Sequence, residues 1–503
     1  MRSVLIFASL LSVAMLRAQY IPSCNLSTET LEQLEAQIIA YQQQLASNPL
    51  EVRSEITYIP ITFHLIANDR GLGRVKEARV LDQLCQLNKD FQAYNIQFFL
   101  RRFNYENSSV LYNDHTEDEA LMRDIRDNNA INIFLVQDAN NDSTLEDGRT
   151  FGYYDTRTDW LVVRRDQIND KSIVLTHEMG HFLGLLHPYN GWDSDPWTAE
   201  KHGNPAPVRS PRNIPTELMD GSNCETAGDR LCDTPPDYFF AFSWDNCNYT
   251  GGALDPDGVL VDPDELNYMG NYFRCDRESY YFSPEQSNIM QLDVNSPRRN
   301  YLRSEATPNV EAPNELVSLK FPEDDGNVPT FNAVSFEWTP VEGATQYLVE
   351  IDRVLSFNIQ TRHFITTEPS LEINNLDASR QYYWRVRPFN AYNTCSEFSE
   401  ASTFTTGSTL DTTQLALIED WRLYPNPVSQ SERLILDIDS RRNFDARIRI
   451  FDLTGRLIFE EERLIENNQL TLDYNITNLP AGVYAFVINT EEGQLERKFV
   501  VTN

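Results

Sequence analysis

The stretch from Thr176 to His187, T-H-E-M-G-H-F-L-G-L-L-H, constrains this chain more than any other part of its sequence. Its histidines are His177, His181 and His187. Side chains four residues apart share one face of a helix, so His177 and His181 can reach the same point. Gly184 has no side chain and can take the left-handed turn that ends a helix. The chain can then fold back and bring His187 to that point as a third nitrogen ligand.

Three neutral imidazoles with one open position are the ligand set of catalytic zinc. Zinc lowers the pKa of a bound water, and Glu178, beside the first histidine, can take the proton. The alternative is an amphipathic helix over Ser172–Leu186 whose histidines are ordinary surface or core residues. Its many apolar residues suit a buried helix, which is compatible with a metal on one face. The length of the H-E-x-x-H-x-x-G-x-x-H pattern favours the metal.

This pattern resembles that of the metzincin metalloproteases. That clan also has a methionine turn, which N-Y-M-G-N-Y at Asn267–Tyr272 resembles, with Met269 beneath the metal. Together with G-D-R-L-C-D-T-P-P at Gly228–Pro236, these segments resemble the pappalysin family, especially its bacterial, cytophagalysin-like members. Ile59–Ile66 and Leu81–Phe91 resemble the family's first strand and helix, so the resemblance covers residues 55–295.

The resemblance implies a catalytic domain over residues 53–300 with the α/β fold of a metzincin and a mixed, twisted sheet. The order of elements agrees with it. We expect a helix over Val75–Ala93, and strands at Ile56–Ala67, Ile96–Phe103, Ile131–Val136 and, as an edge strand above the cleft, Trp160–Arg164. Residues 188–300 are dense in Asp, Asn, Gly and Pro, so loops should dominate there.

The resemblance also implies a calcium site. Asp229 and Thr234 match the family's calcium loop, and calcium prefers hard oxygen ligands. The alternative is a solvated acidic turn. Tyr272 is the candidate for transition-state support. Arg274 matches a position in the specificity pocket, where its charge would disfavour Arg or Lys after the cut; the alternative is a solvated loop residue.

The start of the chain predicts export. Arg2 precedes an apolar run, Val4–Leu16, that is too short to cross a bilayer, and Ala18 is small, as at a cleavage point. We therefore expect a signal peptide over residues 1–18. A pro-segment over residues 19–52 should follow, with a helix at Thr30–Leu45. In the related family a cysteine near Cys24 can bind the zinc as a thiolate and keep the enzyme latent; the alternative is a stray cysteine.

Export makes disulfides available to the seven cysteines, and an odd number leaves at least one unpaired. The resemblance implies a Cys247–Cys275 bridge around the methionine turn, and Cys224 and Cys232 are candidates for a second bridge. The partners of Cys85 and Cys395 stay open. The net charge of −33 argues against nucleic acid or an anionic membrane as a partner. We expect no transmembrane segment and a monomer.

Two all-β sandwich domains should follow the catalytic domain. Residues 312–407 resemble a fibronectin type III module, with Trp338 in its core, and alternating apolar residues suit a sandwich. Residues 408–420 read as a linker. Residues 421–503, from L-Y-P-N-P-V onward, resemble the C-terminal sorting domain of the type IX secretion system, which implies contact with the outer-membrane secretion machinery.

Two functions remain in view. The first is a secreted zinc endopeptidase that cleaves proteins or peptides, exported through the periplasm and outer membrane to the medium or cell surface. The second is a non-catalytic surface adhesin that retains a zinc fold. Glu178 favours the first, because an adhesin has no need of a general base beside the metal.

Overall fold

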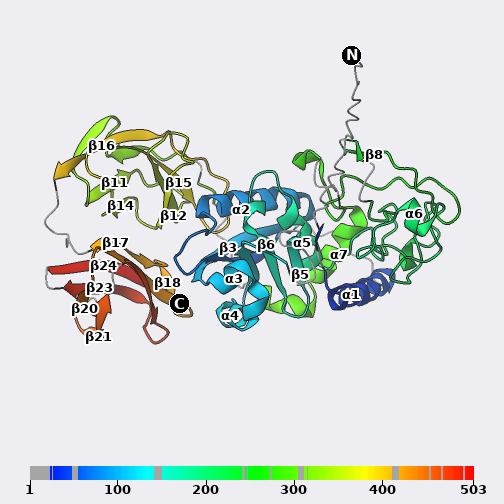
Figure 1. The fold of residues 1–503 in the computed structure, drawn as a ribbon, viewed down its shortest axis with the longest axis horizontal. Helices are drawn as coiled ribbons and strands as arrows, with labels where there is room; N and C mark the ends of the chain where they lie inside the picture. The colour runs from blue at the N-terminus through cyan, green and yellow to red at the C-terminus, as the bar shows by residue number, and fades with distance from the viewer. Residues whose placement is uncertain are drawn as a thin grey trace, which may run out of the picture. The chain divides into compact units, whose positions relative to one another are not determined.

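A computed structural model of the chain describes residues 23–24, 26–47, 55–140, 150–240, 244–245, 247–271, 275–303, 311–313, 315–409, 418–452, 455–465, 468–490 and 493–502. The expected signal peptide lies outside these residues. The chain divides into two compact units, whose elements are labelled in Figure 1. The histidine unit comprises residues 1–49, 140–153 and 177–292, and the sheet unit comprises residues 50–139, 154–176 and 293–503.

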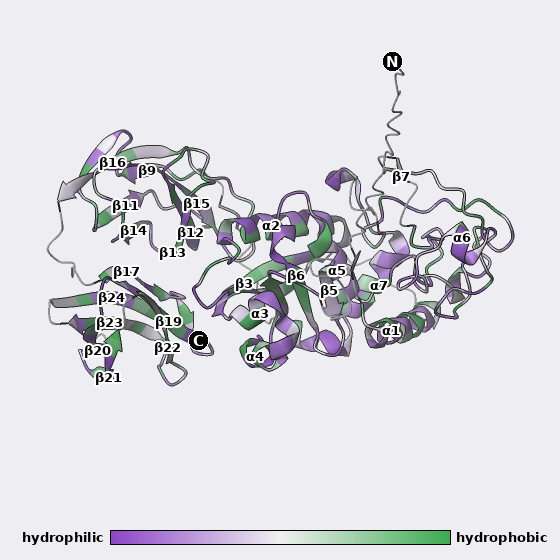
Figure 2. Cartoon of the chain, viewed as in Figure 1, coloured by the Kyte–Doolittle hydropathy of each residue, from purple (hydrophilic) through white to green (hydrophobic). Residues whose placement is uncertain are grey.

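Four parallel strands in the spatial order β6-β4-β2-β3 form the first part of the sheet unit. Their side chains are buried along most of β2, β4 and β6, as expected of parallel strands that are covered on both faces. Figure 2 shows apolar residues along these strands. The bounds are β2 Thr57–Ala67, β3 Ile96–Asn107, β4 Ile131–Val136 and β6 Trp160–Arg164.

Helices lie on both faces of this sheet because the chain reverses its direction across it. The chain passes from β2 to β3 at the end of the sheet and then returns past β2 to β4. Right-handed crossovers that run in opposite directions lie on opposite faces of a sheet. Helix α2 (Glu77–Phe91) makes the first crossover, and α3 (Ser109–Asn113) and α4 (Glu119–Ile125) make the second. In Figure 1, α2 lies above the sheet, and α3 and α4 lie below it. The buried face of α2 has helical spacing: Val80, Leu84, Leu87 and Phe91.

The strand order corrects the expectation that Trp160–Arg164 is an edge strand. Strand β6 lies between β4 and β5 (Thr150–Asp155), whose last two residues belong to the same unit. The W-L-V-V run of β6 is fully buried, which suits an interior strand. A tight turn over residues 156–159 joins β5 to β6, so these two strands run antiparallel and the sheet is mixed, as expected.

The histidine unit consists mostly of loops, as its composition predicts. Disulfides Cys224–Cys232 and Cys247–Cys275 cross-link it, and both pairs were expected from the sequence. An aromatic core that includes Trp192 and Tyr238 packs within it. Its regular elements are β1 Ser23–Cys24, α1 Thr28–Ser47, residues 177–182 of α5 (Val174–Phe182), α6 Ala199–His202, β7 Trp244–Asp245, β8 Asn248–Tyr249 and most of α7 (Pro284–Val294).

The central β module, residues 315–409, is a sandwich of a five-stranded and a three-stranded sheet. Trp338 and Trp384 are fully buried between them. The five-stranded sheet has the order β10-β16-β15-β12-β13, and the other has the order β14-β11-β9. The bounds are β9 Leu319–Phe321, β10 Gly326–Thr330, β11 Val334–Trp338, β12 Gln346–Asp352, β13 Arg362–Thr366, β14 Ser370–Ile373, β15 Gln381–Phe389 and β16 Ser402–Thr409.

The C-terminal β module, residues 418–502, is a second sandwich with the sheets β17-β19-β22 and β18-β24-β23-β20-β21. Leu436, Ile448 and Phe486 are among its fully buried residues. The bounds are β17 Ile418–Tyr424, β18 Val428–Ser429, β19 Arg433–Ser440, β20 Phe444–Asp452, β21 Leu457–Ile465, β22 Asn468–Asn475, β23 Gly482–Thr490 and β24 Gly493–Thr502.

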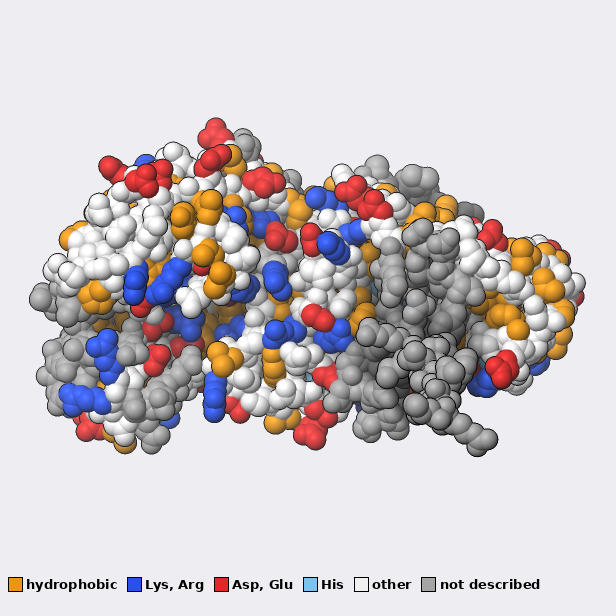
Figure 3. All heavy atoms as spheres, turned by 45° about the horizontal axis from the view of Figure 1, so that its top comes forward, with side chains coloured by type: hydrophobic (Ala, Val, Ile, Leu, Met, Phe, Trp, Pro, Cys, Tyr) orange, Lys and Arg blue, Asp and Glu red, His pale blue; other side chains and the backbone are white. Residues whose placement is uncertain are grey.

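Acidic and basic side chains share one face of the molecule. On the face drawn in Figure 3, acidic side chains are spread over the molecule and basic side chains lie among them. Among the described residues, no helix has both the length and the apolar character needed to cross a membrane.

Candidate metal centre

Helix α5 ends where the sequence predicts. It spans Val174–Phe182, shorter at both ends than the segment from residue 172 to 186. Gly184 has a φ of 93°, and two hydrogen bonds close the helix end: Leu185 N donates to Gly180 O and Gly184 N donates to His181 O, both at 3.0 Å. This pair of bonds is the Schellman arrangement, which favours glycine at that position. The chain can therefore turn back toward the helix and reach His187.

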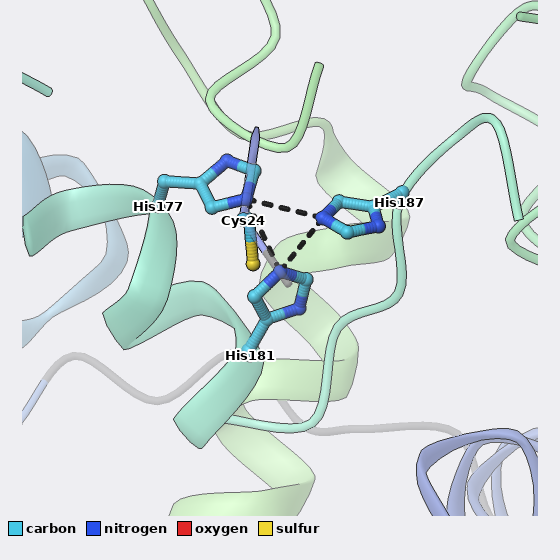
Figure 4. Close-up of side chains that lie close together, drawn as sticks. All are labelled: Cys24, His177, His181 and His187. Carbon is cyan, nitrogen blue, oxygen red and sulfur yellow. Dashed lines mark hydrogen bonds between the residues drawn. The ribbon is translucent and has the colours of Figure 1, made fainter. Parts of the chain in front are cut away.

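Three imidazole rings meet at one point in the histidine unit. The Nε2 atoms of His177, His181 and His187 lie 2.9 to 3.2 Å apart, as the dashed lines in Figure 4 show. All three side chains are buried. Figure 4 shows the sulfur of Cys24, from the short strand β1, pointing toward the same place. The four ligand atoms lie within 4.8 Å of one another.

The other ring nitrogen of each histidine has its own partner. His177 Nδ1 donates to Tyr268 O at 2.7 Å, and His181 Nδ1 donates to Leu185 O at 2.8 Å. A carbonyl oxygen can only accept, so Nδ1 carries the proton and Nε2 keeps a lone pair. His187 Nδ1 lies 2.8 Å from a carboxylate oxygen of Asp193, which also only accepts when ionised. Such partners fix metal-ligating histidines in known sites.

Three lone pairs directed at one another at these distances repel unless a cation lies between them. Burial, and then the other histidines, lower the pKa of His177 to about 3 and that of His181 well below its usual value, so both rings stay neutral. Nitrogens 2.0–2.1 Å from a tetrahedral zinc ion would be about 3.3 Å apart, close to the observed spacing. The donor set therefore fits a soft or borderline divalent metal.

Glu178 and Cys24 meet beside the three rings. The Cys24 thiol donates to Glu178 Oε2 at 3.4 Å. Burial raises the pKa of Glu178 to about 8, and burial and then the charge of Glu178 raise the pKa of the Cys24 thiol. These raised pKa values of Glu178 and Cys24 apply to the site without a cation. A metal ion at the three nitrogens would lower the pKa of both groups. The carboxylate is thus within reach of a group bound at the fourth position.

Met269 packs directly beneath the helix that carries two of the histidines. It is fully buried, and a Cβ placed on Gly180 would lie 2.3 Å from its sulfur. The preceding residue, Tyr268, supplies the carbonyl that holds His177. The segment with Tyr268 and Met269 therefore supports both the helix backbone at Gly180 and the ring of His177.

A second cluster of buried groups lies in the loop expected to bind calcium. Thr234 Oγ1 lies 2.9 and 3.0 Å from the two carboxylate oxygens of Asp229, and both residues are buried. Glu217 is buried as well, and its Oε2 has no hydrogen-bond partner among the described residues. Burial raises the pKa of Asp229 and of Asp237 to about 7 each. Burial, and then Asp229 and Asp237, raise the pKa of Glu217.

This loop is attached to the chain that follows the third histidine. Asn190 Nδ2 donates to Gly228 O at 2.9 Å, and both groups are buried. The ring of His187 stacks on Tyr189, with centroids 4.3 Å apart, and Tyr189 stacks on Phe239. The position of His187 therefore depends on the packing of the loop as well as on its own segment.

Sequence reasoning missed three acidic residues of these two clusters. Asp193 holds His187, whereas Glu217 and Asp237 belong to the buried carboxylates. Asp193 lies six residues after His187 and could have been suspected from that proximity. The other two lie in irregular segments, where no periodicity marks which carboxylates point inward. Tyr272 and Arg274 lie outside the described residues, so their roles stay predictions.

Comparison with known families identifies the C-terminal module. Residues 422–502 match the family described as a secretion system C-terminal sorting domain. This confirms the sorting domain expected over residues 421–503, and it implies an interaction with the secretion machinery.

Two curated proteins resemble the chain. An extracellular metalloprotease of Neurospora crassa is 24% identical over 247 residues, which are 44% of this chain and 80% of that protein. An extracellular metalloprotease of Colletotrichum graminicola is 26% identical over 155 residues, which are 26% of this chain and 52% of that protein. These similarities support a metalloprotease without specifying its type. Together with the sorting domain, they show that the chain is a secreted or cell-surface protein.

Solved structures resemble the chain only weakly. The FN1–FN3 domains of chicken CNTN1 align with 38% of this chain and 68% of theirs, at 13% identity and a TM-score of 0.16. Dimeric latent PorU of Porphyromonas gingivalis aligns with 40% of this chain and 21% of its own, at 14% identity and a TM-score of 0.23. At these scores neither likeness carries an argument about this chain.

The packing of Gly180 against Met269 gives a test of the centre's architecture. Alanine in a helix interior is usually about 0.8–1.0 kcal/mol better than glycine. We expect Gly180→Ala to destabilise the protein by about 1–3 kcal/mol instead, because its methyl group would overlap the Met269 sulfur. Urea unfolding measures the change. Gly252→Ala, where the methyl group meets no atom within 4 Å, is the control, and equal effects of the two variants would contradict the packing.

Proposed function

We propose that this chain is a secreted zinc-dependent endopeptidase of the pappalysin type, within the metzincins. The observation that carries the proposal is the convergence of three buried Nε2 atoms beside the buried carboxylate of Glu178. The similarity to two extracellular metalloproteases supports the same class of reaction.

The residues have separate roles in this proposal. His177, His181 and His187 would hold the ion through Nε2, and a bound zinc ion would acidify a water molecule and polarise the scissile carbonyl. Glu178 lies on the side of the centre that Cys24 enters. From there its carboxylate can accept a proton from the water and pass it to the leaving amine.

Strand β5 is the proposed place for the substrate. Strand β1 pairs with it in parallel, with Ser23 opposite Thr150 and Cys24 opposite Gly152, and this pairing delivers Cys24 to the centre. A peptide that added to the same edge of β5 after β1 had left would bring its own backbone to the same place. The substrate is therefore expected along β5, because β6 has a neighbouring strand on each side.

The second candidate function, that of a non-catalytic adhesin, has less support. A binding protein could keep three histidines and a metal for stability alone. Burying the Glu178 carboxylate beside them has a cost in desolvation. A structural site does not need that group, whereas a hydrolase does.

Hydrolysis of a quenched peptide separates the two functions. In the Cys24→Ala background, we expect Glu178→Gln to lower kcat/KM by about 10²–10⁴-fold, because general base catalysis is lost while the three nitrogens remain. A chelator should abolish the activity of the parent protein. Glu200→Gln, an exposed change of the same kind, is the control. Full activity in Glu178→Gln, or activity that survives the chelator, would contradict the proposal.

We assign Cys24 the role of a latency ligand. Its sulfur lies among the three imidazoles, and helix α1, which follows it, is anchored to the histidine unit. The guanidinium of Arg230 pairs with Glu35 of this helix at 2.6 Å, and Leu34 and Ile38 on the same helix are fully buried. A thiolate held in this way would occupy the position that the water needs.

Activity of the unprocessed full-length chain tests the latency role. We expect Cys24→Ala to raise it at least about tenfold, since tenfold corresponds to only 1.4 kcal/mol of blocking free energy. Glu35→Gln should raise it less, by weakening the anchor, and the exposed Glu32→Gln on the same helix should leave it unchanged. An unprocessed Cys24→Ala protein no more active than the parent would remove Cys24 from this role.

We further propose calcium at the second cluster, with Asp229 and Thr234 as ligands and Glu217 beside them. Burial raises the pKa of Glu217, and the charges of Asp229 and Asp237 raise it further. A divalent cation would satisfy such a group of buried carboxylates better than hydrogen bonds alone. The orphaned Oε2 of Glu217 gives the ion a ligand that the sequence did not suggest. The bound ion would stiffen the loop that supports His187.

Thermal unfolding of calcium-free protein tests this site. Micromolar to millimolar calcium should raise the Tm, because an ion that binds the folded state alone stabilises it. Glu217→Gln should raise the Tm of the calcium-free protein, because it removes one of the buried carboxyls, and should also shrink the shift that calcium causes. The exposed Glu225→Gln is the control. A Tm that is indifferent to calcium in both proteins would exclude the ion.

A further inference from the structure

Strand β3 ends the sheet of the sheet unit, so one of its edges has no neighbouring strand among the described residues. An uncovered edge presents free peptide groups that can pair with another chain, and proteins protect such edges. The peptide groups that point toward this edge belong to alternate residues of the strand. The backbone N–H and C=O of Phe98 both pair with the Asn88 side chain of α2. This side chain accepts from Phe98 N at 2.7 Å and donates to Phe98 O at 2.9 Å.

The next peptide group that points toward this edge, the Leu100 amide, forms a hydrogen bond with the central β module. Leu100 N donates to Ala391 O at 2.8 Å, and Gln97 Nε2 donates to Tyr392 O at 2.8 Å. The ring of Tyr392 stacks on Phe99, with centroids 4.6 Å apart, and meets the Tyr58 ring edge-on at 5.6 Å. The loop that follows β15, residues 390–395, thus supplies both backbone and aromatic contacts to the edge. We call it the edge loop.

The edge loop is prepared for this contact by its own module. Asn390 Oδ1 accepts from the backbone amides of Tyr392 and Asn393 at 3.0 and 2.9 Å. Asn390 Nδ2 donates to the carbonyls of Glu311 and Gly343. These bonds fix the turn of the loop and tie it to the rest of the module, so its position does not depend on the contact with β3 alone.

Two further links join the loop to helix α2. Cys395 forms a disulfide with Cys85, which is buried on α2, and the two residues are separated by 310 positions in the sequence. The buried guanidinium of Arg387 contacts Thr394 O of the loop and pairs with Asp82 of α2. The pairing of Cys85 and Cys395, which the sequence left open, is therefore part of one interface.

We propose that the central β module is a permanent part of the body that contains the four parallel strands, and that the edge loop covers strand β3 and is held there by the Cys85–Cys395 disulfide. This role differs from that of a spacer between two domains. A spacer would need no disulfide across the boundary and no backbone bond to the sheet. The proposal does not depend on the metal or on the proposed reaction.

The C-terminal β module contributes contacts of a different kind farther along β3. Arg102 pairs with Glu432 at 3.2 Å, and the rings of Tyr105 and Tyr424 meet edge-on at 5.1 Å. No disulfide joins this module to the sheet among the described residues. Removal of the sorting domain would therefore leave the locked cover in place.

Hydrogen exchange of the full-length protein tests the proposal at one amide. The Leu100 amide faces away from β2 and is held by Ala391 O, so it should exchange at least tenfold faster when the lock is removed in Cys85→Ser/Cys395→Ser. Tyr392→Ala, which keeps the disulfide and removes the stacked ring, should raise the rate less. Cys224→Ser/Cys232→Ser, which removes a disulfide of the histidine unit, is the matched control and should leave Leu100 unchanged.

Disulfide mapping by mass spectrometry of the untreated protein accompanies this measurement. We expect a peptide that contains Cys85 linked to one that contains Cys395. Free thiols at both positions would overturn the lock. So would rapid Leu100 exchange in the parent protein, or a rate that is the same in the parent, the double-serine variant and Tyr392→Ala. The tyrosine variant keeps the test decisive if the double-serine variant fails to fold.

Discussion

The arrangement of the histidine unit depends on three imidazole nitrogens that point their lone pairs at one another from 2.9 to 3.2 Å. Such a contact is unfavourable without a cation and favourable with one. Three segments hold the rings against this repulsion: the methionine turn through Tyr268 O, the helix end through Leu185 O, and the following loop through Asp193. Each partner fixes the proton on Nδ1 and leaves Nε2 available to a metal.

The cluster around Asp229 also brings together groups whose contact is unfavourable without a cation, and here these groups are carboxylates. Burial raises the pKa values of Glu217, Asp229 and Asp237, and the charges of Asp229 and Asp237 raise that of Glu217 further. A chain with 75 acidic residues could place them all on the surface, where they would cost nothing. Their burial in a segment that packs against the chain after His187 is the basis of the proposed calcium site.

The sequence was informative where a local pattern determines the structure. The helix end at Gly184, the histidine spacing and the apolar run of β4 depend on neighbours along the chain, and each was predicted at or near its observed bounds. It was uninformative where distant segments decide. Strand β6 was wrongly expected at an edge, because the residues of a strand do not determine which strands lie beside it. The Cys85–Cys395 pair and the inward turn of Glu217 likewise depend on packing between distant segments.

Metal analysis of the purified full-length protein tests the central claim most directly. The account predicts one zinc ion per chain, and loss of that zinc in His181→Ala and in His187→Ala. His202→Ala should keep it, because His202 lies in α6, pairs with Asp195 and does not belong to the centre. Full zinc content in His181→Ala, or zinc loss in His202→Ala alone, would contradict the assignment of the three histidines as the metal centre.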